Sequence, residues 1–316
     1  MVSPRLSAAA ALADFDLDVQ GLDLLLERLQ HSLRERSKRL AKRWKTVRRN
    51  GDQDAVHDLR VACRRLLSVL DLVRALDERK TYGKMRRNLK SILKHYSRLR
   101  DAQVQFETLA AVLPGDGPLA SAYRRLLDDR IESLRRKTVA STPELDFKLC
   151  RKAARKFAAF VEQRRSNQEP TGRPLSDAAQ ALVAGLFASF DDSRQQSLHD
   201  RTTASFHQAR IRFKKFRYAV EVLRPILPGV DRAYMERLTA LQTAMGAVQD
   251  LAVLREHLAD FAASPNSPGG RRELARLDEA LGRKHERALG AVQRLSAPWE
   301  GSDFADAFGG TSHDGE

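Results

Sequence analysis

The sequence predicts an all-α protein built from two related helical halves, and three observations support this prediction. Glycine and proline, which interrupt helices, number only 17 and 11 among 316 residues. Leu, Ala and Arg dominate, and all three favour helices. In addition, a basic segment occurs twice, beginning at His57 and again at His207. Such internal similarity indicates a repeated structural unit.

The first half is expected to contain five helices, which end at turn-forming residues. Asn50-Gly51-Asp52 separates the first two helices, Leu76-Asp77 ends the second, and the segment from Pro114 to Pro118 ends the third. The predicted helices lie near residues 17–49, 53–77, 80–113, 116–138 and 143–165.

The second half is expected to contain four helices, near residues 174–198, 202–226, 231–263 and 270–296. Pro170 to Pro174, Pro228-Gly229 and Pro265 to Gly270 separate them. We expect each half to form a four-helix type of bundle, with the extra helix of the first half bridging across. The predicted divisions are an N-terminal tail 1–14, a first half 15–165, a linker 166–173, a second half 174–298 and a disordered tail 299–316.

The repeated segment carries a pattern of charge as well as a pattern of apolar residues. It reads His57-Asp58-Leu59-Arg60-Val61-Ala62-Cys63-Arg64-Arg65, and later His207-Gln208-Ala209-Arg210-Ile211-Arg212-Phe213-Lys214-Lys215. The helix that follows each copy contains an aspartate, Asp101 in the first half and Asp250 in the second. Packing alone would preserve the apolar positions, so the repeated charge suggests a use for the charge.

Helical geometry gathers these cations on one side of each helix. Arg60 and Arg64 lie with His57, well away from the apolar stripe, and Arg210 and Lys214 lie with His207 in the second copy. No acidic residue stands four positions away from Arg60 or Arg64, or from Lys94 or Arg98, so the charge is not balanced along the helix. The whole chain has 56 basic and 41 acidic residues, a net charge of +15. Polyanions are therefore the expected partners: nucleic acid, polyphosphate or an anionic membrane surface.

The double pattern His-x-x-Arg-x-x-x-(Arg/Lys)-(Arg/Lys), with Leu99-Arg100-Asp101 and Val248-Gln249-Asp250 at the later element, resembles the CHAD domain, the conserved histidine α-helical domain. The resemblance covers about residues 15–298. It implies two helical bundles related by pseudo-twofold symmetry, forming one domain with a central basic groove or pore. It also implies binding of inorganic polyphosphate and association with polyphosphate granules and their proteins. The chain departs from a strict repeat at Gln208, which replaces Asp58, and at Ser97, where the second copy has Gly246.

Carried over by position, the resemblance implies a set of polyphosphate-binding residues: His57, Arg60, Arg64, Arg65, Lys84, Arg87, Lys94, Arg98, His207, Arg210, Lys214, Lys215 and Arg217. Arginine binds phosphate oxygens in pairs, whereas lysine acts as a mobile point charge. For His57 and His207 two roles stay open: direct hydrogen bonding to phosphate, or fixing a neighbouring arginine or helix. Asp101 and Asp250 are expected to orient the basic side chains. No metal ligand and no cofactor is predicted.

Parts of the sequence resemble proteins of two other functions. His57-Asp58 and His199-Asp200 spell the dipeptide of metal-dependent phosphohydrolases, but their surroundings are cationic and would repel a divalent ion. No phosphate-binding loop of the Walker type is present, so we expect no enzymatic activity. The second alternative is a nucleic-acid-binding protein that ignores sequence. The basic faces lack the aromatic residues that stack on single-stranded bases, so only weak, nonspecific binding of nucleic acid is expected.

The expected location is the cytoplasm, on polyphosphate granules. No apolar run approaches the roughly 18 residues of a membrane span. Ala11-Leu12-Ala13 imitates a signal-peptidase site, but the apolar stretch before it is short and mostly alanine. The two cysteines, Cys63 and Cys150, do not suggest a disulfide framework.

Overall fold

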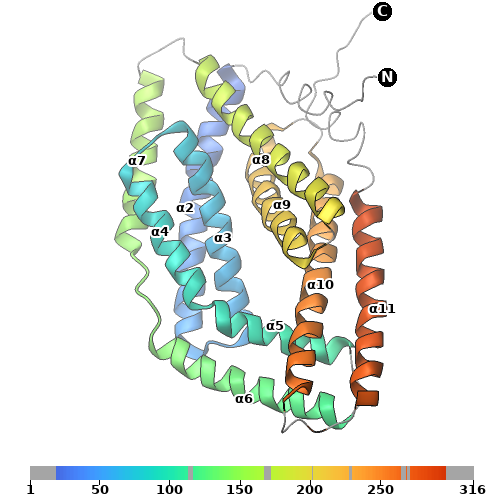
Figure 1. Ribbon diagram of the computed structural model, residues 1–316. Coiled ribbons are helices and arrows are strands. Elements are labelled where there is room, and N and C mark those ends of the chain that lie inside the picture. Colours follow the sequence, from blue (N-terminus) through green and yellow to red (C-terminus); the bar gives the residue numbers. More distant parts are fainter. Residues whose placement is uncertain are drawn as a thin grey trace, which may run out of the picture.

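The computed structural model describes residues 19–112, 117–166, 172–200, 202–227, 230–264, 268 and 271–296. Within these residues the chain forms helices and no strand, so the prediction of an all-α fold is confirmed (Figure 1). No helix among them is long and apolar enough to cross a membrane. The predicted tails 1–14 and 299–316 lie outside the described residues, as does most of the linker, 167–171.

The helices are α2 (Val19–Asn50), α3 (Gln53–Leu76), α4 (Lys80–His95), α5 (Ser97–Val112), α6 (Pro118–Ala140), α7 (Phe147–Ser166), α8 (Gly172–Asp200), α9 (Thr203–Leu223), the short 3-10 helix η1 (Arg224–Ile226), α10 (Arg232–Ala262) and α11 (Arg271–Ser296). Their beginnings follow the capping chemistry of the sequence. The side chains of Asp52, Thr202 and Asp231 each accept a hydrogen bond from a backbone N–H in the first turn of α3, α9 and α10. Gly51, between α2 and α3, has a φ of 59°, which glycine adopts at little cost.

The prediction of one continuous helix over 80–113 is wrong, because the chain breaks at Tyr96 into α4 and α5. Neither glycine nor proline stands at the break. Instead, the Tyr96 ring is fully buried and its hydroxyl lies 2.7 Å from Thr142 Oγ1. Next to it, His95 Nε2 lies 2.8 Å from the backbone oxygen of Thr138 at the end of α6. Contacts with a distant helix therefore decide where this helix ends.

The helices fall into two groups that α5 and α6 connect (Figure 1). Helices α2, α3, α4 and α7 stand on one side, and α8, α9, α10 and α11 on the other. Below them α5 and α6 run across, and α10 and α11 pack onto α5. Two helices, rather than the one expected, thus bridge the molecule.

Apolar packing joins the two groups. The larger hydrophobic cluster extends from α2, α3, α4 and α7 to α8, α9 and the first part of α10, and it includes the fully buried rings of Phe157, Phe213 and Phe216. A second cluster unites α5 and α6 with α10 and α11, around Tyr123 and Leu254. Both clusters contain helices from each side of the linker. The division into two homologous halves with pseudo-twofold symmetry stays a prediction.

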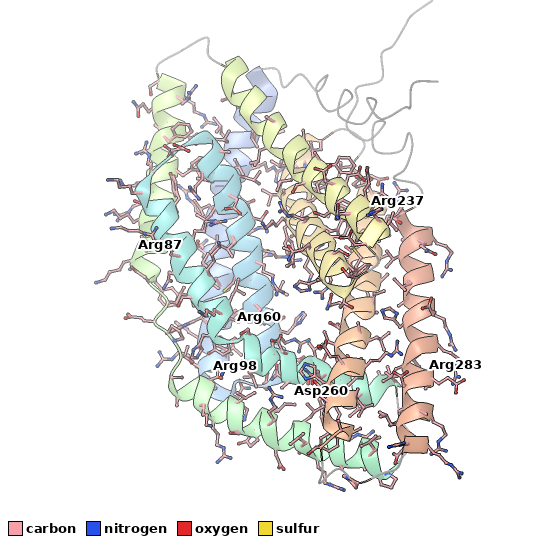
Figure 2. The ribbon with its side chains drawn as sticks, in the orientation of Figure 1. Arg60, Arg87, Arg98, Arg237, Asp260 and Arg283 are labelled. Carbon is pink, nitrogen blue, oxygen red and sulfur yellow. The ribbon has the colours of Figure 1, made fainter. Side chains whose placement is uncertain are left out.

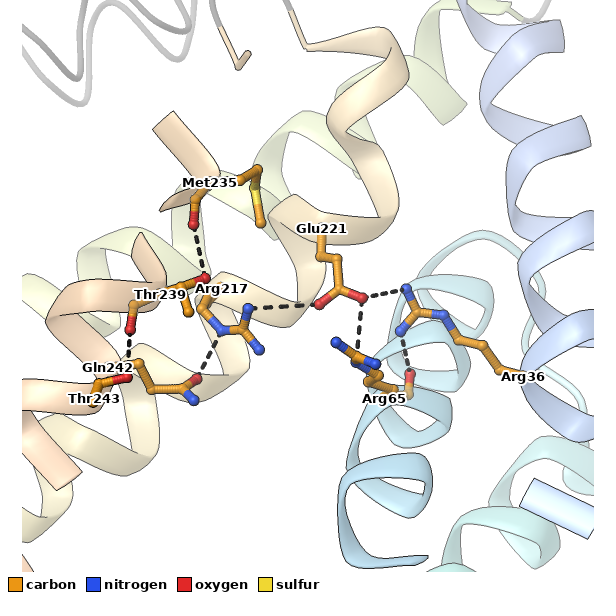
Figure 3. Close-up of polar contacts among 8 residues, drawn as sticks. All are labelled: Arg36, Arg65, Arg217, Glu221, Met235, Thr239, Gln242 and Thr243. Carbon is orange, nitrogen blue, oxygen red and sulfur yellow. Dashed lines mark hydrogen bonds and ion pairs between the residues drawn. The ribbon is translucent and has the colours of Figure 1, made fainter. Parts of the chain in front are cut away.

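An ionic cluster around Glu221 ties the two basic helices α3 and α9 together (Figure 3). Oε1 of Glu221, on α9, lies 3.2 Å from Arg36 Nη2 of α2 and 3.3 Å from Arg65 Nε of α3. Its other oxygen, Oε2, lies 3.7 Å from Arg217 Nη1, one turn earlier on α9. Arg36 also donates a 3.2 Å hydrogen bond to the carbonyl of Arg65. One carboxylate thus holds arginines from three helices, which we call the Glu221 cluster.

Replacing Glu221 with glutamine should destabilise the fold, since three half-buried guanidinium groups would lose their counter-charge. The expected loss is about 1–2 kcal/mol in the free energy of unfolding, measured by urea denaturation. The matched control is Glu236→Gln, which removes an exposed ion pair with Arg232 on α10. That control should change stability by less than about 0.5 kcal/mol. Equal effects of the two substitutions would contradict a structural role for the Glu221 cluster.

Candidate functional site

The two repeated motifs meet in the interior of the fold. Burial lowers the pKa of Arg210 and of Lys214 on α9, and the charge of Arg64 on α3 lowers both further. The charge of Arg60 acts on Lys214 in the same way. Segments that begin 150 positions apart, at His57 and His207, therefore contribute cations to one site. We call Arg60, Arg64, Arg100, Arg210 and Lys214 the central cluster.

The surrounding positive charge and burial lower the pKa of Lys214 strongly. Its side chain is half-buried, and burial is the main reason that its pKa falls. Arg210, one turn away, and Arg64 reinforce the effect, and together they bring the pKa to about 7. At neutral pH this lysine is close to its own midpoint of protonation. A lysine in this state gains a proton readily when an anion approaches.

Arg60 is held in place by the break between α4 and α5. Its Nη1 donates a 2.6 Å hydrogen bond to the carbonyl of Leu93, in the last turn of α4. Carbonyl groups at the end of a helix lack the partner that the next turn would supply, so this bond replaces one that the break removes. Burial and then the charge of Arg64 lower the pKa of Arg60 to about 10, which still leaves it protonated at neutral pH.

Arg100 belongs to the central cluster although the sequence did not predict it. Its Nη1 and Nη2 lie 2.8 and 3.2 Å from the two carboxylate oxygens of Glu107, and its side chain is only 15% exposed. In a continuous helix from Lys80, Arg100 would fall on the apolar side, away from Arg87 and Lys94. The break at Tyr96 turns it toward the site. The one sequence feature that could have indicated a role for Arg100 is its position directly before Asp101.

The two predicted orienting aspartates lie beside the cluster. Burial raises the pKa of both Asp101 and Asp250, and neighbouring cations oppose the rise, first Arg60 for Asp101 and first Arg210 for Asp250. Asp250 Oδ1 is 4.0 Å from Arg210 Nη2, a distance at the upper limit for an ion pair. Both carboxylates thus lie among the cations of the cluster, and that they orient these cations stays a prediction.

Several donors in the site have no partner within the described part of the chain. Arg64 and Lys214 make no hydrogen bond or ion pair there, Arg210 Nε is buried without a hydrogen bond, and so is His207 Nδ1. Five cations thus face only three carboxylates: Asp101, Asp250 and Glu107. Buried donors normally find partners, so a group of unpaired ones points to an anionic ligand.

Comparison with known proteins identifies the family and shows a similar fold. The sequence model of the family described as the CHAD domain matches residues 12–259. The chain belongs to the CHAD domain family. The CHAD domain from the plant Ricinus communis superposes with a TM-score of 0.57 at 22% identity, covering 87% of this chain and 88% of that one. PptA from Streptomyces chartreusis gives 0.56 at 18% identity, covering 87% and 99%. A search of curated proteins gave no match.

Other predicted site residues of this CHAD domain are ion-paired within the protein or exposed. Arg65 and Arg217 bind Glu221, and Arg217 also donates a 2.7 Å hydrogen bond to Gln242 Oε1 (Figure 3). Lys215 is exposed, because it lies about 140° around α9 from Arg210. Arg65 and Arg217 share the one carboxylate of Glu221 with Arg36, so their positive charge is only partly compensated inside the protein.

The predicted histidines differ in their surroundings. His57 is exposed at the edge of the site, and partial burial and then the charge of Arg100 lower its pKa. His207 is more enclosed, and its unpartnered Nδ1 leaves it able to bond a ligand. The four remaining predicted cations, Lys84, Arg87, Lys94 and Arg98, are exposed on α4 and at the start of α5. Figure 2 shows Arg87 at the outer edge of the molecule, whereas Arg60 lies toward the middle.

Lys214→Met should stabilise the CHAD fold in a pH-dependent way. The folded pKa of about 7 lies below the value of about 10.4 expected in the unfolded chain. The cost of the buried charge is therefore fully present below about pH 7 and fades as the pH rises toward 10. Urea denaturation should show the variant more stable than wild type by at least about 1.4 kcal/mol near pH 6, the equivalent of one pKa unit, and less so near pH 9. Lys215→Met, at the exposed neighbouring position, should show no such trend. A gain in stability that did not depend on pH would contradict the lowered pKa of Lys214.

Proposed function

We propose that this protein binds inorganic polyphosphate at the central cluster and does not catalyse a reaction on it. One observation carries the proposal: two sequence motifs place Arg64 and Lys214 together, half-buried and without a counter-ion among the described residues. Membership in the CHAD family connects the chain with polyphosphate, and the site supplies the chemistry that such a ligand needs.

The donors suit a linear chain of phosphates. Arg210 offers a buried Nε–H that has no acceptor, and Arg64 offers a whole guanidinium group. Arginine forks bind phosphate oxygens through two parallel hydrogen bonds. Lys214 adds a charge that grows on binding, because nearby phosphate raises the pKa of an ammonium group. Arg60 and Arg100 are anchored by protein contacts and contribute fixed positive charge.

The cluster favours polyphosphate over nucleic acid as the specific ligand. Its donors converge from α3, α5 and α9, and no aromatic ring is among its members. Proteins that grip single strands combine positive charge with aromatic stacking, and this site provides only the charge. Polyphosphate presents a dense row of oxyanions and no bases, so charge alone suffices to bind it.

Absence of catalysis is part of the proposal, and the surroundings of the two His-Asp dipeptides support it. Asp58 Oδ2 forms a 2.8 Å ion pair with Arg43 Nη1, so this carboxylate is engaged by an arginine. Asp200 accepts hydrogen bonds from Gln196. Within the described residues no group of three or more His, Cys, Asp or Glu side chains could hold a metal ion. We also propose that the protein resides in the cytoplasm on polyphosphate granules, where its ligand is most concentrated.

Binding can be tested by calorimetric titration of tripolyphosphate into wild type and the double variant Arg64→Gln/Lys214→Gln. The variant should bind at least about tenfold more weakly, and its slope of log affinity against log salt should be shallower by about 1.5. Arg272→Gln/Lys215→Gln removes the same net charge from exposed positions and should bind almost as wild type.

Three outcomes would contradict the proposal: equal losses in both double variants, displacement of polyphosphate by duplex DNA at equal phosphate concentration, or phosphate release that His57→Ala abolishes. The first would mean that only net charge matters. The second would favour a nucleic-acid-binding function, and the third an enzyme.

A further inference from the structure

Helix α4 presents an exposed row of cations on the side opposite the core. Its buried residues, including Met85, Leu89 and Ile92, share one face. The opposite face carries Lys80, Lys84, Arg87, Lys90 and Lys94, all exposed. The helix contains no acidic residue at all. Nothing on α4 therefore balances this row of charge.

Helix α7 continues the same pattern. It buries Cys150, Ala153 and Phe157, and its solvent side carries the exposed residues Lys148, Arg151, Lys152 and Arg155. Helix α7 packs against α4 and α2, and α4 packs against α3, so the outward sides of α4 and α7 adjoin. Figure 2 shows Arg87 pointing outward at this edge of the molecule. We call these nine cations the α4–α7 face.

The α4–α7 face offers a partner positive charge that no ion pair neutralises, and it offers no large apolar side chain. None of its nine side chains forms an ion pair with any residue that the structure describes. The large apolar side chains exposed among those residues, Leu24, Leu126 and Leu198, all lie on other helices. A partner would therefore be held by charge and not by apolar or aromatic contact. A flexible polyanion without bases fits this surface best.

The α4–α7 face begins where the central cluster ends. Arg60 donates its hydrogen bond to Leu93, so the cluster reaches the residue directly before Lys94. Arg98 is exposed in the first turn of α5, directly after the break at Tyr96. From Lys94 the row of cations runs back along α4, whose 16 residues span about 24 Å. A linear anion leaving the cluster would meet Lys94 first and then the rest of the row.

We propose that the α4–α7 face is a second contact surface, which binds the distal part of a long polyphosphate chain whose other part occupies the central cluster. The inference rests on the proposed function. Exposed cations hold a short anion weakly, because they stay hydrated and are screened by salt. Once the cluster holds one stretch of a long chain, the remaining phosphates are present near the face at high effective concentration. The protein thereby distinguishes long polyphosphate from short.

The test compares two quadruple variants that lose the same charge. The first variant removes the four cations that α7 contributes to the face: Lys148→Gln/Arg151→Gln/Lys152→Gln/Arg155→Gln. The second, Arg271→Gln/Arg272→Gln/Arg276→Gln/Arg287→Gln, removes four exposed arginines from α11, at the opposite side of the molecule (Figure 1). None of the eight positions belongs to the central cluster. Each variant and the wild type are titrated with tripolyphosphate and with long-chain polyphosphate.

The α7 variant should bind long-chain polyphosphate at least about tenfold more weakly than wild type, with a salt slope shallower by about 3. Its affinity for tripolyphosphate should change less than about twofold, since a short anion does not gain from the face. The α11 variant should bind both ligands almost as wild type. Equal losses of long-chain affinity in the two variants would overturn the inference, and so would an α7 variant that loses affinity for duplex RNA but not for long polyphosphate. Loss of tripolyphosphate binding in the Arg64→Gln/Lys214→Gln variant reports separately on the central cluster, so the two proposals can fail independently.

Discussion

The structure depends on holding together two helices that repel one another. Helices α3 and α9 both direct unpaired cations into the same space, and like charges at short range destabilise the fold. Glu221 opposes this repulsion, because its carboxylate binds Arg65 of α3 and Arg217 of α9 while Arg36 joins from α2. The apolar cluster that contains Phe213 and Phe216 supplies the remaining attraction. On this face of α9 the ion-paired Glu221 thus stands two turns beyond the unpaired Lys214.

The arginines of this fold therefore divide into two kinds. Those of the Glu221 cluster share a single carboxylate, which holds arginines of three helices together. Those of the central cluster keep part of their hydrogen-bonding capacity free, at a cost in desolvation that shows in the lowered pKa of Arg60 and of Lys214. An anion that enters the site relieves both the desolvation and the mutual repulsion. In the proposed function, the residues that weaken the free protein are the ones that bind the ligand.

The break at Tyr96 links the fold to the site. It frees the carbonyl of Leu93, which then fixes Arg60, and it turns Arg100 toward the cluster. It also separates the exposed row on α4 from the enclosed site. A straight helix over the same residues would have placed Arg100 among apolar side chains. One local feature thus shapes the interior site and marks its border with the outer surface.

The sequence by itself determined the helices and which side of each one is charged. Composition, capping residues and apolar spacing are local properties, so they predicted the all-α fold, most helix ends, and the cations Arg60, Arg64, Arg210 and Lys214. Tertiary structure decided which of the predicted cations act together. Arg65 has a counter-ion because Glu221 of α9 lies opposite it, and Arg100 joins the site because a buried tyrosine breaks its helix. The pairing of Arg65 with Glu221 depends on the distance between α3 and α9, and no spacing along the chain encodes that distance.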